Sequence, residues 1–292
     1  MKFLKAIRRV LFMLIGSLPI NGWTYKFLSR SYYLSRFIFN NHRLPKTNYS
    51  DLRDFLYYRQ FNGKLLEEFA KSLTHKGFGK DFIRKKLGAK YTIKTLSIIR
   101  NQEDIQKFET AEYPLVIKPV HSCGRYFIIN SHDELRQKEE QIIGWLGHDY
   151  FLETLEENYF GLEKALIIEP YIKKEYFLEG SLHCLAGKVK IISLIDRFDS
   201  QKRRESFSRS MQPLGVSLGQ EYKKINISSI QCFNDLILKA EALVGEIDYI
   251  RVDFYLGNTD FLFGELTNLP AGGALKFYPP EMDFKFNDAL FN

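Results

Sequence analysis

The stretch Asp248–Gly273, DYIRVDFYLGNTDFLFGELTNLPAGG, decides the fold. Two runs rich in aromatic and branched residues, Tyr249–Leu256 and Phe261–Leu266, flank the turn-forming segment Gly257–Asp260. Such a pattern predicts a β-hairpin with a short loop. A turn centred near Thr259 fixes which residues of the two strands face each other.

In this register Asp253 faces Glu265, and Arg251 faces Thr267. Side chains alternate between the two faces of a strand, so these four polar residues share one face of the hairpin. The other face is predicted to be apolar and to carry Val252, Phe254, Leu256, Leu262 and Leu266.

Two opposed carboxylates suggest a cation site. Directly opposed Cβ atoms lie about 5 Å apart, so Asp253 and Glu265 repel each other unless a positive charge lies between them. Magnesium binds one or two protein carboxylates and completes its shell with water and phosphates, and Arg251 is suited to phosphate oxygens. The alternative is a hairpin whose polar face is simply solvated.

The overall composition places few limits on function. The 292 residues form a chain long enough for a sizeable core in two or three lobes. The net charge of +7 favours anionic partners such as nucleotides, acidic glycans or lipid surfaces. Cys123, Cys184 and Cys232 show no disulfide or zinc spacing, which fits a reducing, cytoplasmic setting.

Residues 1–15, MKFLKAIRRVLFMLI, form a predicted amphipathic basic helix. Its apolar run, Val10–Ile15, is too short to span a bilayer. Peripheral contact with an anionic membrane, packing on the next lobe, and a removed signal peptide all stay open.

Aromatic residues alternate with arginines between Asn21 and Phe61. Nucleic-acid and sugar-binding surfaces have this composition. We favour a small helical lobe with an aromatic core and arginines that extend to solvent, because no nucleic-acid motif accompanies the pattern. No nucleic-acid partner is therefore expected.

Two basic segments follow a helix predicted over Asp51–Leu73. Thr74–Tyr91 holds Lys76 and Lys80, which can reach phosphates. Tyr113–Pro119 is a predicted buried strand that carries Lys118, and the next residues, HSCGRYFII, form a small-residue turn that can wrap a phosphate.

The remaining elements alternate helices and strands. Ser131 and Glu134 form a capping box that opens a helix. Pro170 predicts that the strand Ala165–Ile172 ends pairing and lies at an edge or between lobes. Three further elements are predicted: a hairpin of Glu179–Ala186 and Lys188–Ile195, a polar loop over Ser200–Gly219, and a helix from Ser228 to about Glu246.

The order of these signals resembles the ATP-grasp superfamily: a lysine strand, a small-residue turn, a helix, IIEPYI, a second hairpin, then RVDF and GELT before a glycine-rich turn. It is most similar to the TupA-like branch of bacterial surface-polysaccharide clusters, over about Thr74 to Asp283. The resemblance implies an α+β fold in which two α+β subdomains grip ATP, preceded by a helical N-terminal region. It implies three parts. These are the helical N-terminal region 1–73, the small subdomain 74–168 with the phosphate loop, and the large subdomain 169–292 with the metal-binding hairpin.

The resemblance also implies roles for individual residues. Lys76 and Lys118 would contact phosphates, Arg251 would hold the γ-phosphate, and Asp253 and Glu265 would bind Mg²⁺. The flexible phosphate loop would comprise His121, Ser122, Cys123 and Gly124, although a structural role for His121 stays open. Adenine and ribose contacts would come from Glu169, Tyr171, Ile172, and Glu179 or Glu175.

The chain departs from the family pattern at three places. Thr267 stands where most ATP-grasp proteins carry a metal-binding asparagine, and Asn268 follows it as the candidate third ligand. Glu179–Ser181 replaces a D-Y-K pattern in the second hairpin, and His75 stands where an aspartate often precedes the first lysine.

The implied activity is an ATP- and Mg²⁺-dependent carboxylate–amine ligation through an acyl phosphate. The acceptor would be an acidic sugar and the amine an amino acid, in the cytoplasm or at the inner face of the membrane. Two alternatives stay open: a sugar kinase on the same fold, and a non-catalytic module that binds glycan and membrane. The site contains no Ser–His or Cys–His pair, consistent with catalysis by positioning and electrostatics.

Overall fold

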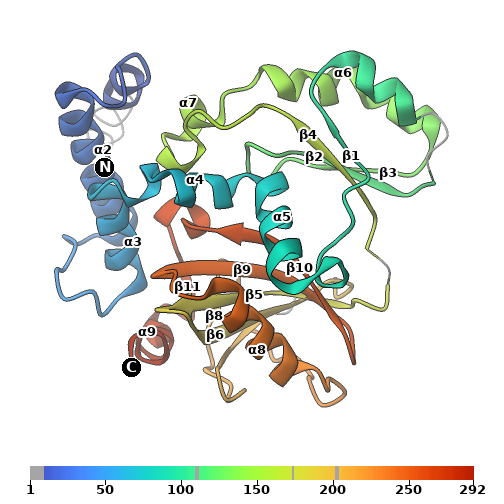
Figure 1. Ribbon diagram of the computed structural model, residues 1–292. Coiled ribbons are helices and arrows are strands. Elements are labelled where there is room, and N and C mark those ends of the chain that lie inside the picture. Colours follow the sequence, from blue (N-terminus) through green and yellow to red (C-terminus); the bar gives the residue numbers. More distant parts are fainter. Residues whose placement is uncertain (1–9, 109–111, 173, 201–203) are drawn as a thin grey trace.

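The computed structural model describes residues 10–108, 112–172, 174–200 and 204–292. Two antiparallel sheets face each other, with helices between and around them (Figure 1). The helices are α2 Trp23–Asn41, α3 Leu52–Phe61, α4 Glu68–Thr74, α5 Lys76–Leu87, α6 His132–Gly147, α7 Tyr150–Thr154, α8 Phe233–Val244 and α9 Asp283–Phe291. The predicted three-part division of the chain stays a prediction.

The larger sheet has five strands in the order β10-β9-β5-β6-β7. Its neighbouring strands are all antiparallel. The strands are β5 Leu178–Leu185, β6 Lys188–Asp196, β7 Arg204–Ser208, β9 Tyr249–Leu256 and β10 Phe261–Thr267. Both predicted hairpins are therefore confirmed, and their strands pair with each other through β5 and β9.

The predicted pairs of the key hairpin are confirmed, because Glu265 opposes Asp253 and Thr267 opposes Arg251. A β-bulge at Gly264 shifts the register by one residue between the turn and these pairs. Because of this bulge, the predicted side-chain direction of Leu262 is wrong. Leu262 points away from the core, whereas Phe261 and Phe263 are buried in it.

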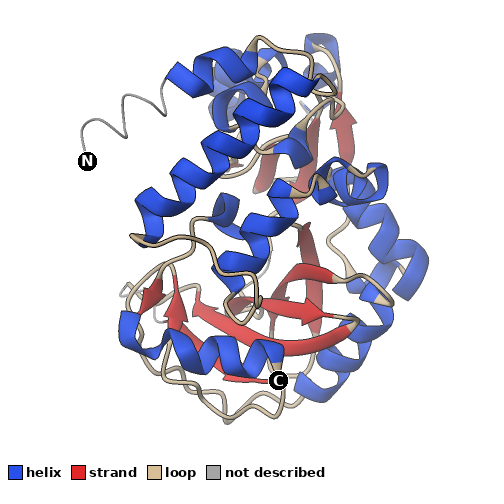
Figure 2. Cartoon of the chain, turned by 90° about the vertical axis from the view of Figure 1, so that its left-hand side faces the viewer, coloured by secondary structure: helices blue, strands red, loops and turns tan. Residues whose placement is uncertain are grey.

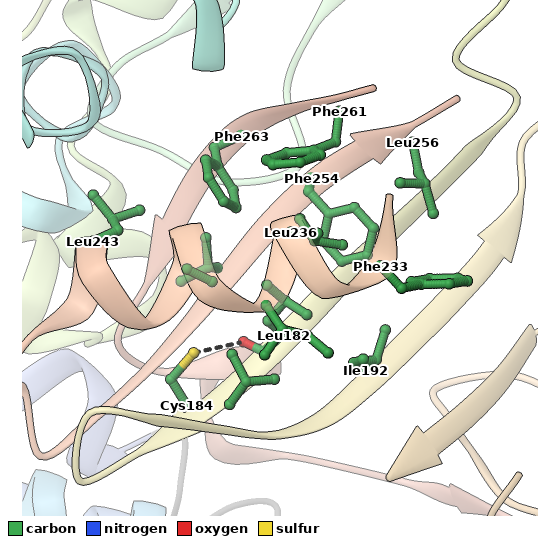
Figure 3. Close-up of a cluster of buried hydrophobic side chains, with 14 of the residues drawn as sticks. Leu182, Cys184, Ile192, Phe233, Leu236, Leu243, Phe254, Leu256, Phe261 and Phe263 are labelled. Atoms are coloured by element: carbon green, nitrogen blue, oxygen red, sulfur yellow. Dashed lines mark hydrogen bonds between the residues drawn. The ribbon is translucent and has the colours of Figure 1, made fainter. Parts of the chain in front are cut away.

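The main core lies between the larger sheet and α8. Leu236 and Leu243 of the helix belong to one buried cluster with Leu182, Ile192 and Phe254 of the strands, and Figure 3 shows Leu236 near Phe254. The apolar positions of α8 recur with helical spacing, so one side of the helix is buried. This helix is shorter than the predicted span from Ser228 to Glu246.

The opposite face of the larger sheet is divided in two. Around Tyr249 and Ile191 it is covered by apolar side chains of α3 and α9, among them Leu56, Phe286 and Leu290. The other end of the same face carries polar side chains and is open. The covering helices thus confine the polar surface to one end of the sheet.

The smaller sheet has four strands in the order β1-β4-β2-β3, with α6 packed against it (Figure 1). Ser131 caps α6 by accepting a hydrogen bond from the Glu134 backbone N–H, as predicted. Its strands are β1 Ser97–Ile99, β2 Leu115–Pro119, β3 Phe127–Ile129 and β4 Leu166–Pro170.

The predicted edge position of the Ala165–Ile172 segment is wrong, because β4 lies inside the smaller sheet between β1 and β2. Pro170 is its last residue, so the missing N–H falls where pairing ends. Two other expectations are corrected. The predicted helix Asp51–Leu73 is divided into α3 and α4, and the predicted loop Ser200–Gly219 contains β7 and β8, Ser217–Leu218, which pairs with β11, Phe277–Tyr278.

The N-terminal helices pack along one side of the molecule (Figure 2). Their aromatic side chains form a separate core with α7, which agrees with the predicted helical lobe. Arg30 lies 4.8 Å from the ring centre of Phe61, and Arg43 lies 5.1 Å from that of Phe37. Residues 1–9 of the predicted basic helix lie outside the described residues, and residues 10–16 are helical.

Within the described ranges, no helix is both long and apolar enough to cross a bilayer.

A close approach at Gly180 generates a stability prediction. A Cβ atom at this position would lie 2.4 Å from the Ser193 carbonyl oxygen and 2.6 Å from the ring of Phe254. We expect Gly180→Ala to lower the free energy of unfolding by about 1–3 kcal/mol through overpacking. Urea denaturation followed by circular dichroism measures the change.

Gly144→Ala is the matched control, because a Cβ at this position of α6 meets nothing within 4 Å. Its stability should stay unchanged or rise by up to about 1 kcal/mol. Equal stability of Gly180→Ala and wild type would contradict the prediction.

Candidate active site

A cleft of about 500 Å³ lies over the open, polar end of the larger sheet. Five of the residues singled out from the sequence line it, and they come from both sheets: Lys118, Glu179, Arg251, Asp253 and Glu265. Lys118 belongs to β2 of the smaller sheet, whereas the other four belong to β5, β9 and β10. The cleft is therefore shared by the two sheets.

The opposed carboxylates are each contacted by a cation. Arg251 donates two hydrogen bonds to Asp253, at 2.7 and 2.6 Å, and a third to the Thr267 hydroxyl at 3.3 Å. The Lys76 ammonium lies 3.5 Å from Glu265. These cations reduce the repulsion that the hairpin register imposes.

The two acids have different proton affinities. Burial raises the pKa of Asp253 to about 6, although Arg251 opposes this shift. Burial would also raise the pKa of Glu265, but the charges of Lys76, Lys118 and Arg251 outweigh it and lower that pKa below its usual value. Glu265 is thus the more strongly ionised of the two.

A second charged cluster connects α5 to the smaller sheet. Glu169 of β4 is almost fully buried, and its two oxygens lie 2.6 Å from the Lys80 ammonium and 3.0 Å from that of Lys118. Buried charges require such pairing because desolvation is costly. Lys76 and Lys80 stand about one helical turn apart on α5, and they pair with Glu265 and Glu169, respectively.

The predicted phosphate loop lies against the start of α5. The Lys76 ammonium donates to the carbonyl of Ser122, and the Lys76 backbone N–H donates to the carbonyl of Val120 at 3.2 Å. The hydroxyl of Ser122 is buried and has no hydrogen-bond partner among the described residues. Gly124 has a positive φ of 73°, which glycine adopts without strain.

Most of the predicted loop and adenine-edge residues do not line this cleft: Lys76, His121, Ser122, Cys123, Gly124, Glu169, Tyr171 and Ile172 lie outside its lining. His121 is buried beside the loop, and burial lowers the pKa of its imidazole. Tyr171 and Ile172 follow β4, and the Tyr171 N–H donates to the carbonyl of Pro114. They come directly after the last residue of the strand that carries Glu169.

Asn268 is also placed outside this cleft. Its amide nitrogen donates to the carbonyl of Ala70 at 2.6 Å and to the hydroxyl of Thr74 at 3.2 Å. Both acceptors belong to α4, and Asn268 lines a different cavity together with Ala70. Its role as a third metal ligand stays a prediction.

Several polar residues that line the cleft were not predicted from the sequence, among them His183, Ser193, Arg204 and Lys276. His183 makes a 3.0 Å hydrogen bond with the Tyr249 hydroxyl. Alternation along the second hairpin places His183 on the polar face, so the pattern held a signal for it. For Arg204 the sequence pattern held no such signal, because the segment that forms its strand was predicted to be a loop.

The donor set limits what the site can bind. No group of three or more His, Cys, Asp or Glu side chains suited to a metal ion occurs in the described part of the chain. Two carboxylates beside open space fit Mg²⁺, which binds few protein ligands and keeps several waters. The surrounding lysines and arginine fit phosphate oxygens.

Two antiparallel sheets that share a cleft of lysines, an arginine and paired acids agree with the class expected from the sequence, the ATP-grasp proteins. The comparisons confirm it: the chain belongs to the TupA-like ATP-grasp family, whose model matches residues 55–291.

A curated relative is the D-alanine–D-alanine ligase of Sulfurovum sp. (strain NBC37-1), 27% identical over 176 residues. The match covers 58% of this chain and 43% of that protein, so the chain spans less than half of this relative's length. Similar solved structures include D-alanine–D-alanine ligase from Bacillus anthracis complexed with ATP, at 18% identity and a TM-score of 0.44, covering 68% of this chain and 54% of that one.

The ATP-grasp ligase PsnB, complexed with minimal precursor, Mg and ADP, is also similar. Its identity is 14% and its TM-score 0.44, with coverage of 82% of this chain and 65% of that one.

The buried lysine cluster predicts a pH effect on stability. Burial lowers the pKa of Lys80 from 10.5 to about 8, although Glu169 opposes this shift. Between these values the unfolded chain binds more protons than the folded one, so this residue makes the free energy of unfolding rise with pH. From pH 8 to 10, wild type should gain stability relative to Lys80→Met in urea titrations.

Lys118 acts outside this window, because Glu169 overcomes the effect of burial and raises the pKa of Lys118 above its usual value. Lys85→Met, a change at an exposed position of the same helix as Lys80, should follow the wild-type curve. Parallel curves for wild type and Lys80→Met would show that Lys80 does not titrate in this range.

Proposed function

We propose that the protein is an ATP- and Mg²⁺-dependent carboxylate–amine ligase that forms ADP and acts through an acyl phosphate. The observation that carries this proposal is the opposition of Asp253 and Glu265 in a cleft that Arg251 and Lys118 also line. Family membership and the D-alanine–D-alanine ligase relative support the same reaction class.

Asp253 and Glu265 would hold Mg²⁺, since both carboxylates line the cleft and lie opposite each other. The bound ion would neutralise phosphate charge and orient the phosphoryl group for transfer. Arg251 and Lys118 would stabilise the charge that develops on the γ-phosphoryl group. Lys76 and the loop from His121 to Gly124 would close over the phosphates.

The nucleotide base would lie beside β4. We assign Glu169 and the backbone of Tyr171 and Ile172 to the adenine edge, and Glu179 to the ribose. The buried Lys80 and the partly buried Lys118 both pair with Glu169, and these ion pairs support its position beside the cleft. Positioning of this kind is the main contribution of an enzyme that needs no covalent nucleophile.

The acceptor carboxylate would attack the γ-phosphoryl group, and an amine would then displace phosphate from the acyl phosphate. In line with the family, we propose an acidic sugar as acceptor, an amino acid as amine, and a role in bacterial surface polysaccharide synthesis inside the cell. Capsule assembly is one such setting.

Hydroxylamine trapping tests the reaction. Incubated with Mg²⁺, ATP and a panel of uronic and amino acids, wild type should release ADP and form a hydroxamate from the acyl phosphate. Asp253→Asn and Glu265→Gln should each lower the rate of ADP release about a hundredfold, because each removes an ionised group of the phosphoryl-transfer site.

Glu140→Gln is the matched control, since Glu140 is exposed on α6. A phosphorylated sugar without hydroxamate would instead identify a kinase. Absence of any Mg²⁺-dependent ATP binding in thermal shift assays would reject both enzymes and favour the non-catalytic binding module.

We infer a second property, peripheral contact with an anionic membrane, from exposed apolar side chains at the N-terminal helices. Trp23 is 79% exposed and stacks on Phe27, which is 58% exposed, with ring centres 5.8 Å apart. Met13, in the preceding helix, is 67% exposed. Residues 1–9 add four basic residues and belong to the predicted amphipathic basic helix 1–15, for which membrane contact is one of the open possibilities.

Replacing both aromatic residues, Trp23→Ala with Phe27→Ala, should weaken binding to phosphatidylserine-containing vesicles at least about tenfold, because each ring contributes apolar burial. Vesicle co-sedimentation measures the loss. Phe284→Ala, at an exposed aromatic position of α9, is the control. Equal sedimentation of all variants, or none for wild type, would reject membrane contact.

A further inference from the structure

We propose that the part of the cleft beyond the two carboxylates is the acceptor subsite, and that Arg204 makes it specific for a polyhydroxylated acid with a second anionic group. The inference rests on the proposed ligase function and names its substrate class. It is carried by the side-chain row across the larger sheet and by an arginine without an acidic partner among the described residues.

The row begins at the metal-binding pair. Strand register places Glu265, Asp253, Ser181, Ser193 and Ser206 directly opposite one another across all five strands. Neighbouring strands lie about 4.8 Å apart, so the last serine is ~14 Å from the position of Asp253. An elongated acceptor of about one sugar ring with its substituents fits along this row.

The sheet surface beneath the subsite is polar and carries short side chains. The hydroxyls of Ser193 and Ser206 lie 2.9 Å apart, and either can donate to the other. Serine side chains are short, so they leave the space above the sheet open to a ligand. Hydroxyl groups that donate and accept suit a polyhydroxylated molecule better than an apolar one.

Arg204 lies on the same strand as the last serine of the row, two residues before it. It pairs with Ile195, which in turn pairs with Glu179 of β5, so it stands one row away from the serines. Its Nη1 donates to the Leu218 carbonyl at 3.3 Å. Its Nε is buried and has no hydrogen-bond partner within the described ranges. Among the residues that the structure describes, no carboxylate lies within 4.0 Å of this guanidinium.

The contrast with Arg251 is informative, because that arginine already has its carboxylate in Asp253. A partly buried guanidinium without an acid carries an uncompensated desolvation cost, which an anionic ligand group would offset. Burial also lowers the pKa of Arg204, with Glu179 opposing the shift.

The remaining wall comes from the turn that follows β10. Ala271, Ala274 and Leu275 line the cleft, and the exposed Lys276 adds a second positive charge to its lining. Gly219 lies beside the guanidinium, since a Cβ there would approach its Nη1 to 3.5 Å. An acceptor would thus place its reacting carboxylate near Arg251 and its second anion near Arg204.

Isothermal titration with two matched probes tests the assignment. Glucuronic acid 1-phosphate carries the second anion that glucuronic acid lacks, and both are titrated with Mg²⁺ and a non-hydrolysable ATP analogue present to fill the γ-phosphate position. Wild type should bind the phosphorylated probe at least ~tenfold more tightly. Arg204→Gln should remove that preference, and Arg204→Lys should retain part of it.

The nucleotide-induced thermal shift should be the same in wild type and in all variants. Arg209→Gln is the matched control, because Arg209 lies just past β7 and pairs with Glu241 outside the cleft. It should keep the wild-type preference.

Four results would overturn the inference alone: binding of neither probe by a protein that binds nucleotide, equal affinity for both probes, an unchanged preference in Arg204→Gln, or loss of the nucleotide shift in that variant. A wild-type protein without any nucleotide shift would overturn the proposed function as well.

Discussion

The placement of two acids opposite each other on β9 and β10 is the constraint on which the site depends. Two carboxylates so close repel each other, and the fold compensates by bringing Arg251 to one and Lys76 to the other. The lysine comes from a helix far away in sequence, so the local repulsion is relieved only in the folded chain. In the proposed function, the same charges would serve a metal ion and phosphate.

Strand β9 contributes to both the core and the cleft, because its side chains alternate between the two faces of the sheet. Val252 and Phe254 enter the main core against α8, while Arg251 and Asp253 face the cleft. Because β9 pairs with strands on both sides, its position is fixed by a ladder on each edge. The rigid sheet explains how polar side chains at the cleft can keep a defined spacing.

Helix α5 connects the two sheets electrostatically. It packs with the core of the larger sheet through Ile83, while Lys80 reaches the buried Glu169 of the smaller one. Lys118 shares that acid and also lines the cleft. The buried acid shared by two lysines connects the smaller sheet to α5, and removal of Glu169 would leave both lysines without this partner.

The sequence by itself determined the hairpin, its opposed acids and the order of motifs that identifies the family, because alternation and turn residues act over a few positions. It did not determine the bulge at Gly264, the interior position of β4 or the strand that carries Arg204. These depend on pairing between distant segments, and local patterns carry no information about such partners. Only the tertiary structure brought Lys80 to Glu169 and aligned Ser181, Ser193 and Ser206 with Asp253, since strand order and register arise from long-range packing.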